Sequence, residues 1–188
     1  MTSKNDSDLL LDRVEFKIFA ANEHLNNLQE LQSNHPDALR IDPALKREME
    51  IDCFLTQILG TLDCLLMLIN SRLELGIASE RVDLATIQSA LNARTKNISL
   101  LTDMHEAAAY DGWLWVLKEF RDLTMQIPTI DAQYFLFGDT PSSSKDQSEA
   151  NRTSEELNNK SLIRYFQQSL KQVRNLVSSI RVKEPLLM

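Results

Sequence analysis

The residues of this chain that could do chemistry are concentrated at the polar end of the Trp-rich stretch "WLWVLKEFRDLTMQIPT", residues 113–129. There, Arg121 stands beside Asp122. A guanidinium offers several N–H donors in one plane and binds phosphates or carboxylates through paired hydrogen bonds. The two residues therefore form either a binding or reaction centre or a salt bridge on a core helix.

A further polar residue, Asp63, stands in the nearly apolar stretch "ILGTLDCLLMLIN". A buried carboxylate without a partner is costly, so Asp63 lies either on a narrow exposed edge or next to a bonded cation. Arg121 is a natural partner, because its base should be half-buried while its head group reaches something polar. We therefore expect an Asp63–Arg121 bridge inside a helical bundle.

The order of these features resembles the HEPN superfamily of small helical bundles and bacterial proteins near it. A long helix with "EIDCFLTQILGTLDCLLMLIN" is followed by a Trp-rich helix that ends in Arg and a polar residue, over about residues 45–127. In that superfamily the fourth helix typically bears Arg, a polar residue and then His, and paired copies cleave RNA without metal across a dimer cleft. Arg121 and Asp122 match the first two positions.

The His of the family pattern is missing from this chain. Four residues after Asp122 stands Gln126, and no His follows His105. Metal-independent RNA cleavage needs proton transfer at the 2′-hydroxyl and at the leaving oxygen, and His suits both because its pKa lies near working pH. Gln126 has no titratable proton, although it can hydrogen-bond a phosphate or a base edge. The resemblance therefore implies that binding persists where catalysis does not.

The C-terminal segment carries a separate candidate surface, a basic stripe about 100° around the helix from an apolar stripe. The basic stripe consists of Lys160, Arg164, Lys171, Arg174 and Arg181. Basic amphipathic helices bind anionic lipid or nucleic acid. The alternative is that the apolar stripe docks on the acidic body, or on a second copy, and leaves the basic stripe solvated. The scarcity of base-stacking aromatic residues favours this alternative.

Metal and cofactor chemistry are not predicted. A di-iron bundle needs Glu-x-x-His pairs on two inward faces, and none of His24, His35 and His105 follows a Glu by three residues. Cys53 and Cys64 are 11 residues apart on one predicted helix. That is about 16 Å of rise, too far for a disulfide, so we expect reduced cysteines.

These residues are predicted to lie on helices. The 4 Gly and 5 Pro of the chain leave little material for an all-β fold. Apolar residues recur at steps of three and four along five segments, and Arg94 interrupts the stripe of the third. The predicted helices span about 7–33, 42–75, 83–101 and 112–126, followed by one after 155. We predict an all-α fold, an antiparallel up-down four-helix bundle with an additional C-terminal amphipathic helix.

The chain is predicted to be one domain with a tail. The bundle covers residues 1–137, and 138–154 form a flexible polar linker, since "GDTPSSSKDQSEANRTS" has Ala150 as its only ordinary hydrophobe. Residues 155–188 form the basic helix, which packs on the bundle or on a partner. The start "MTSKNDSDLL" has no secretory apolar region, and the longest apolar stretch is interrupted by polar residues, so a cytoplasmic protein outside the membrane is expected.

The predicted function is that of a non-catalytic HEPN-like protein that acts through protein–protein contact, as a homodimer or with another protein. One alternative is a metal-independent ribonuclease of HEPN type with a non-standard acid/base residue, for which His105 is the first substitute. The other is nucleic-acid binding through the basic C-terminal helix. The net charge of −7 argues against phosphate binding by the whole surface.

Overall fold

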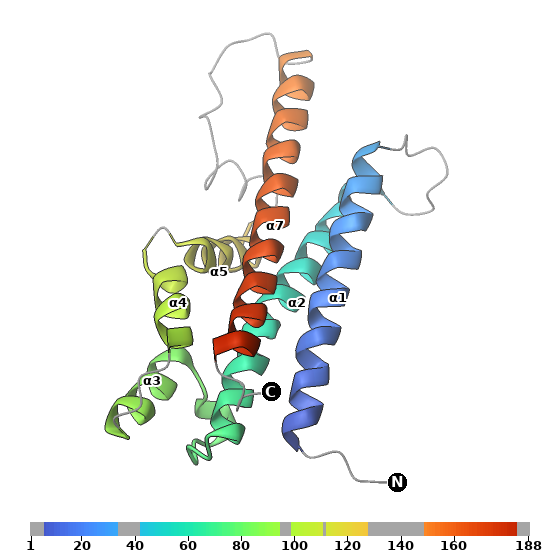
Figure 1. Cartoon of the computed structure of the whole chain (residues 1–188). Helices are drawn as coiled ribbons and strands as arrows, with labels where there is room; N and C mark the ends of the chain where they lie inside the picture. Colours follow the sequence, from blue (N-terminus) through green and yellow to red (C-terminus); the bar gives the residue numbers. More distant parts are fainter. Residues whose placement is uncertain (1–5, 34–41, 95–98, 111, 128–148, 184–188) are drawn as a thin grey trace, which may run out of the picture.

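The computed structural model describes residues 6–33, 42–94, 99–110, 112–127 and 149–183. This part of the chain contains helices and no strand, which confirms the all-α prediction (Figure 1). The α-helices are α1 (Asp6–Ser33), α2 (Pro43–Arg72), α3 (Leu84–Ala93), α4 (Ser99–Ala108), α5 (Trp113–Thr124) and α7 (Glu149–Lys183), and a 3-10 turn, η1 (Ser79–Arg81), precedes α3.

The helices α1 and α2 form a long antiparallel pair, against which α7 packs (Figure 1). The start of α2 agrees with its prediction. Asp42 caps the helix by accepting a hydrogen bond from the backbone N–H of Ala44 at 3.0 Å, and Pro43 takes the first helical position, where no N–H is needed. The paired helices thus provide the frame on which the shorter elements lie.

The predicted third helix is divided into α3 and α4, so the single helix over 83–101 was wrong. Arg94 follows the last residue of α3 and donates from Nη1 to the carbonyl oxygen of Leu73 and from Nη2 to that of Glu74, both at 2.9 Å. Carbonyls at a helix end have no partner within their helix. The cation in the apolar stripe therefore holds the end of α2.

The fourth predicted helix exists as α5 but lies across the long helices instead of running alongside them (Figure 1). It begins after Gly112, where an added Cβ would lie 2.2 Å from the carbonyl oxygen of Ala107. Only glycine lets the chain pass this close to the end of α4.

Because α5 crosses the long helices, the bundle consists of three long helices with shorter helices on one side (Figure 1). This arrangement differs from four antiparallel helices.

The C-terminal helix α7 begins at Glu149, six residues before its predicted start at 155. The rest of the predicted linker, 138–148, lies outside the described residues. Within α7, Phe166, Leu170 and Val173 are buried in the same core as α1, α2 and α5. The apolar stripe of this helix therefore docks on its own chain.

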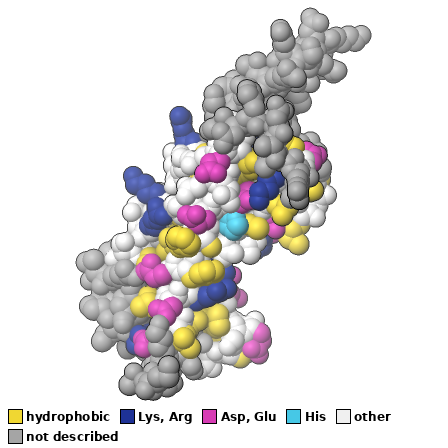
Figure 2. Space-filling view, turned by 90° about the vertical axis from the view of Figure 1, so that its right-hand side faces the viewer, with side chains coloured by type: hydrophobic (Ala, Val, Ile, Leu, Met, Phe, Trp, Pro, Cys, Tyr) yellow, Lys and Arg dark blue, Asp and Glu magenta, His cyan; other side chains and the backbone are white. Residues whose placement is uncertain are grey.

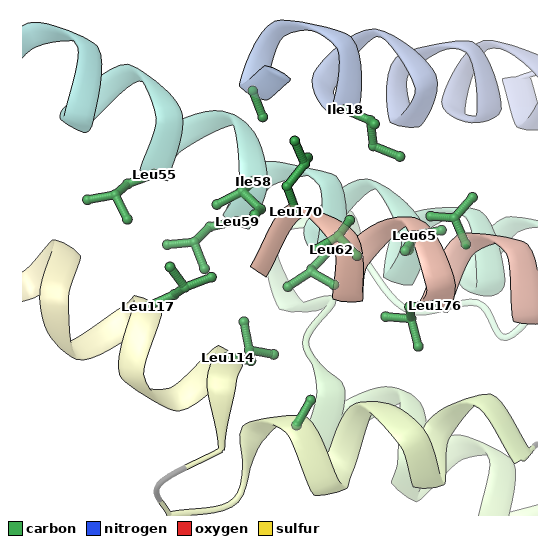
Figure 3. Packing of buried hydrophobic residues seen from close by; sticks show 14 of the residues in the cluster. Ile18, Leu55, Ile58, Leu59, Leu62, Leu65, Leu114, Leu117, Leu170 and Leu176 are labelled. Atoms are coloured by element: carbon green, nitrogen blue, oxygen red, sulfur yellow. The ribbon is translucent and has the colours of Figure 1, made fainter. Parts of the chain in front are cut away.

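The core lies between α1, α2, α5 and α7. Figure 3 shows Leu59 of α2 and Leu117 of α5 pointing toward each other, and Leu170 of α7 belongs to the same cluster. Phe166 stacks on Phe54 with ring centroids 4.3 Å apart. Each such side chain, when fully buried, contributes about 1.5–3 kcal/mol to folding.

The helix α2 is long enough and apolar enough to cross a membrane. The core helix of a soluble protein can meet the same criteria of length and composition. Its most apolar 18-residue window is 61% buried inside the protein. The window is therefore largely occupied in packing against the other helices.

Candidate functional site

The polar end of α5 brings together the three residues of the predicted motif. Arg121 donates from Nε and Nη2 to Oδ1 of Asp122, at 3.0 and 2.8 Å. One turn further on, Gln126 donates from Nε2 to the backbone carbonyl oxygen of Asp122 at 3.3 Å. Asp122 and Gln126 are exposed, and the Arg121 side chain is 40% exposed. The motif is therefore a small hydrogen-bonded group on the surface of the last turn.

The predicted Asp63–Arg121 bridge was wrong, because Arg121 is paired with its neighbour Asp122. Asp63 lies on the exposed edge of α2, one of the two placements that the sequence allowed. A hydrated carboxylate needs no buried cation, so nothing compels the pair to form. Both residues nevertheless lie on the same side of the molecule, since they line one hollow between α2 and α5.

That hollow has a volume of about 90 Å³ and is charged at its rim. Its apolar lining includes Leu59, Leu62, Leu66, Leu84, Met104 and Leu114. Its charged residues are Asp63, Asp83, Lys118 and Arg121. This arrangement suits one apolar side chain flanked by charges and lacks the imidazole that the resemblance would require for proton transfer.

Asp83 already has a structural role at this rim. It caps α3 by accepting a hydrogen bond from the backbone N–H of Thr86 at 2.7 Å. This bond, together with the Thr86 hydroxyl and the charge of Lys118, lowers the pKa of Asp83. Asp83 is therefore stabilised as a carboxylate and is poorly suited to donate a proton.

A buried polar cluster between α1 and α2 was not predicted from the sequence. The carboxylate of Glu50, only 5% exposed, lies 2.6 Å from Nζ of Lys46 and 2.7 Å from Nδ1 of His24. It also accepts a hydrogen bond from Nδ2 of Asn27 at 3.1 Å. Burial raises the pKa of Glu50, but the hydrogen bonds from Lys46, His24 and Asn27 outweigh it, so the pKa is lowered.

The hydrogen bonds of the Glu50 cluster have a structural role, since they hold a buried carboxylate between α1 and α2. Because an ionised carboxylate only accepts hydrogen bonds, Nδ1 of His24 carries the proton in this arrangement. Two donors on one turn of α1 and one on α2 thus satisfy a single buried acid. The spacing of Lys46 and Glu50, four residues apart, and of His24 and Asn27, three apart, was the available signal. Nothing in the sequence says that these two pairs meet.

The basic stripe on α7 is solvated where the structure describes its side chains. Arg164, Lys171 and Arg174 are exposed, whereas the side chains of Lys160 and Arg181 lie outside the described part. Arg174 donates from Nη2 to Oδ1 of Asn22 in α1 at 2.9 Å. At least one member of the stripe therefore helps to hold α7 against α1.

Tyr165 joins α7 to the start of α5. Its hydroxyl donates to the carbonyl oxygen of Trp113 at 2.9 Å. Burial raises the pKa of Tyr165 to about 12. The hydroxyl thus stays protonated at neutral pH and serves as a structural donor.

The described residues contain no group of three or more His, Cys, Asp or Glu side chains placed to hold a metal ion. Cys53 and Cys64 are free thiols, as predicted. Burial raises the pKa of both, which disfavours the reactive thiolate. These cysteines therefore have the properties of packing residues.

A larger hollow of about 220 Å³ lies among α1, α2 and α7. It is lined mainly by apolar residues, with Arg47 and Gln32 as its polar members. None of the residues predicted to form a site lies there.

Comparison of this chain with protein-family models, curated proteins and solved structures finds no significant match.

Proposed function

We propose that this chain is a non-catalytic helical-bundle protein, related in type to the HEPN superfamily, that acts through protein–protein contact as a homodimer. The observation that carries the proposal is the bonding within the α5 motif. Arg121 donates two hydrogen bonds to the carboxylate of Asp122, and Gln126 donates one to the backbone carbonyl oxygen of the same residue. A phosphate at Arg121 would have to compete with a carboxylate already in place.

The proton transfers of RNA cleavage lack the expected donor and acceptor at this motif. The position where the resemblance expects His holds Gln126, which cannot titrate. His105 is exposed on α4 and is not among the residues that line the hollow beside Arg121. These features favour contact over catalysis.

Contact as a mode of action is supported by large apolar side chains on the surface. About half or more of the side chain is exposed at Leu9, Phe16, Phe19, Leu45, Met49, Tyr110 and Met125. Interfaces are enriched in aromatic residues and Met, and such residues lose their contact with water when a partner binds. Five of these seven residues lie on α1 or on the first turns of α2, whereas the two most exposed, Tyr110 and Met125, lie elsewhere.

The proposal is tested by incubating the purified chain with RNA in the presence of a chelator, alongside Arg121→Ala and Gln126→His. We expect the wild type to leave RNA intact. Cleavage by the wild type that Arg121→Ala abolishes, in a variant with unchanged circular dichroism, would establish the ribonuclease alternative. Salt-dependent retention on RNA without cleavage would instead favour the nucleic-acid alternative.

A further inference from the structure

The helix α1 is apolar on two sides. Its inner stripe, which includes Val14, Ile18 and Leu25, is buried in the core. Its outer face carries Leu9, Phe16 and Phe19, which are 52%, 49% and 62% exposed. At about 100° per residue, these three side chains lie within about 80° of one another around the helix. Figure 2 shows hydrophobic side chains lying among charged ones on the side of the molecule where α1 lies.

Among the charges on this outer face, which also include the exposed Asp12, Arg13 and Glu23 are opposite in sign and equally far from its centre. Arg13 lies with Cζ 4.7 Å from the centroid of the Phe16 ring. Glu23 is exposed on the same side of the helix. Arg13 and Glu23 are each five residues from position 18. In an antiparallel pair of identical helices related by a twofold axis, residues equally far from the axis on either side face each other.

We propose that the outer face of α1 binds the same face of a second copy, antiparallel, about a twofold axis at the level of residue 18. This inference rests on the proposed homodimer and assigns its interface. Arg13 then meets Glu23 of the partner subunit twice, once on each side of the axis, while Phe16 and Phe19 are covered at the centre. The contact is self-complementary in charge as well as apolar, as a closed dimer requires.

The dimensions of the face suit such a contact. The 28 residues of α1 extend about 42 Å. A stable interface buries about 800 Å² on each partner, more than three apolar side chains supply, so neighbouring residues must contribute. Met49, 48% exposed, stands next to Glu50, whose carboxylate meets His24 of α1. The surface of α2 beside α1 can therefore extend the interface.

The charge of α1 argues for a protein partner over a lipid surface. Residues 8–32 contain five acidic side chains and two basic ones. Helices that lie on anionic membranes are rich in Lys and Arg on their polar face. The apolar outer face of α1 is thus set in surroundings that an anionic membrane repels.

The proposed interface also separates the two copies of the α5 motif. Figure 1 shows α5 and α1 on opposite sides of α7. A dimer through the outer face of α1 would therefore leave each Arg121 facing solvent and far from its counterpart. A ribonuclease of the type that the resemblance implies would need the opposite arrangement.

The test is sedimentation equilibrium of the full chain and of charge-reversal variants. We expect a dimer whose Kd rises about tenfold in Arg13→Glu and in Glu23→Arg, because each places like charges together at both ends of the contact. The double variant should return to within a few-fold of the wild-type Kd, since it exchanges the two charges and rebuilds both pairs. Single variants that weaken the dimer without rescue in the double variant would overturn the antiparallel register.

A second pair of variants separates this inference from the proposed function. Phe16→Ser with Phe19→Ser should raise the dimer Kd at least a hundredfold, whereas Tyr110→Ser, at a more exposed aromatic residue elsewhere, should leave it unchanged. A wild-type dimer unaffected by the Phe variants would overturn the assigned interface and leave the proposed homodimer standing. A wild type that is monomeric at all concentrations would overturn both. Binding of the wild type, but not the Phe double variant, to anionic lipid vesicles would show that the face binds lipid.

Discussion

The carboxylate of Glu50 on α2 lies 2.7 Å from Nδ1 of His24 on α1. This buried acid therefore joins the two helices of the antiparallel pair. With Lys46 and Asn27 as further donors, the acid is held in its ionised form. Removal of the acid leaves several donors without their acceptor. The cluster is therefore a sensitive place to measure how strongly α1 and α2 are joined.

We predict that Glu50→Ala lowers the free energy of unfolding by about 1–3 kcal/mol at neutral pH, because Lys46, His24 and Asn27 lose a charged acceptor. Urea denaturation followed by circular dichroism measures this change. Glu30→Gln, a change at an exposed acid on α1, serves as the control and should shift stability by less than about 0.5 kcal/mol. Equal effects of the two variants would contradict a structural role for the cluster.

The same cluster predicts the direction of a pH effect. The pKa of Glu50 is lowered in the folded chain, so the folded state binds fewer protons than the unfolded state below the ordinary value of 4.5. Its stabilising contribution is present above that value and is lost as pH falls through the lowered pKa. Glu50→Gln should therefore lose less stability than the wild type between neutral pH and acid. Parallel pH profiles of the two proteins, measured by thermal unfolding, would exclude this contribution.

The two hydrogen bonds of Arg94 to the end of α2 predict different losses of stability in the Ala and Lys variants of this residue. Arg94→Ala should cost about 0.5–1.5 kcal/mol, since it removes both bonds to carbonyls beyond the last turn. Arg94→Lys should restore only part of this, because an ammonium lacks the planar fork that reaches two acceptors. Arg81→Ala, an exposed cation on η1, is the control. Full recovery in Arg94→Lys, measured by denaturation, would mean that charge alone matters there.

Much of the helical framework could be predicted from local pattern, because capping residues and apolar periodicity act over a few residues. Asp42 and Pro43 mark the start of α2, and the range of α1 was predicted to within a residue. The division of the third helix was missed because Arg94 acts on the end of α2, 20 residues away. The periodicity of apolar residues within one helix cannot show a hydrogen-bond partner that lies 20 residues away in the sequence.

The candidate site was harder to predict for the same physical reason. Asp63 and Arg121 do lie on one hollow, as their residue types suggested, but the nearer carboxylate of Asp122 takes the hydrogen bonds. The cluster around Glu50 depends on partners 23 and 26 residues away on another helix. Only the packing of α1 against α2 brings these together. Side-chain pairing across helices is therefore the part that local sequence leaves open.

Two glycines, Gly112 just before α5 and Gly60 within α2, predict opposite responses to the same substitution. An added Cβ at Gly112 would meet the backbone carbonyl oxygen of Ala107 at 2.2 Å, whereas at Gly60 it would meet the end of the flexible Lys17 side chain at 2.7 Å. Gly112→Ala should cost more than about 1 kcal/mol, because a backbone must move. Gly60→Ala should be neutral or stabilising, because Ala is favoured over Gly by about 0.5–1 kcal/mol inside a helix and Lys17 can turn away. Thermal unfolding of both variants checks the order, and a reversed order would contradict the close approach of α4 and α5.

The last prediction concerns the coupling of Asp63 to Arg121. Since Arg121 is bonded to Asp122 and Asp63 is exposed, Asp63→Ala and Arg121→Ala should lower stability additively, within about 0.5 kcal/mol in a double-mutant cycle. Arg121→Ala and Asp122→Ala should instead show a small coupling of about 0.2–1 kcal/mol, because an exposed pair is screened by solvent and salt. Raising the salt concentration should diminish the second coupling and leave the first near zero. A coupling above about 1 kcal/mol between Asp63 and Arg121 would mean that the two meet across the hollow in solution, and the guanidinium would then be a link between α2 and α5.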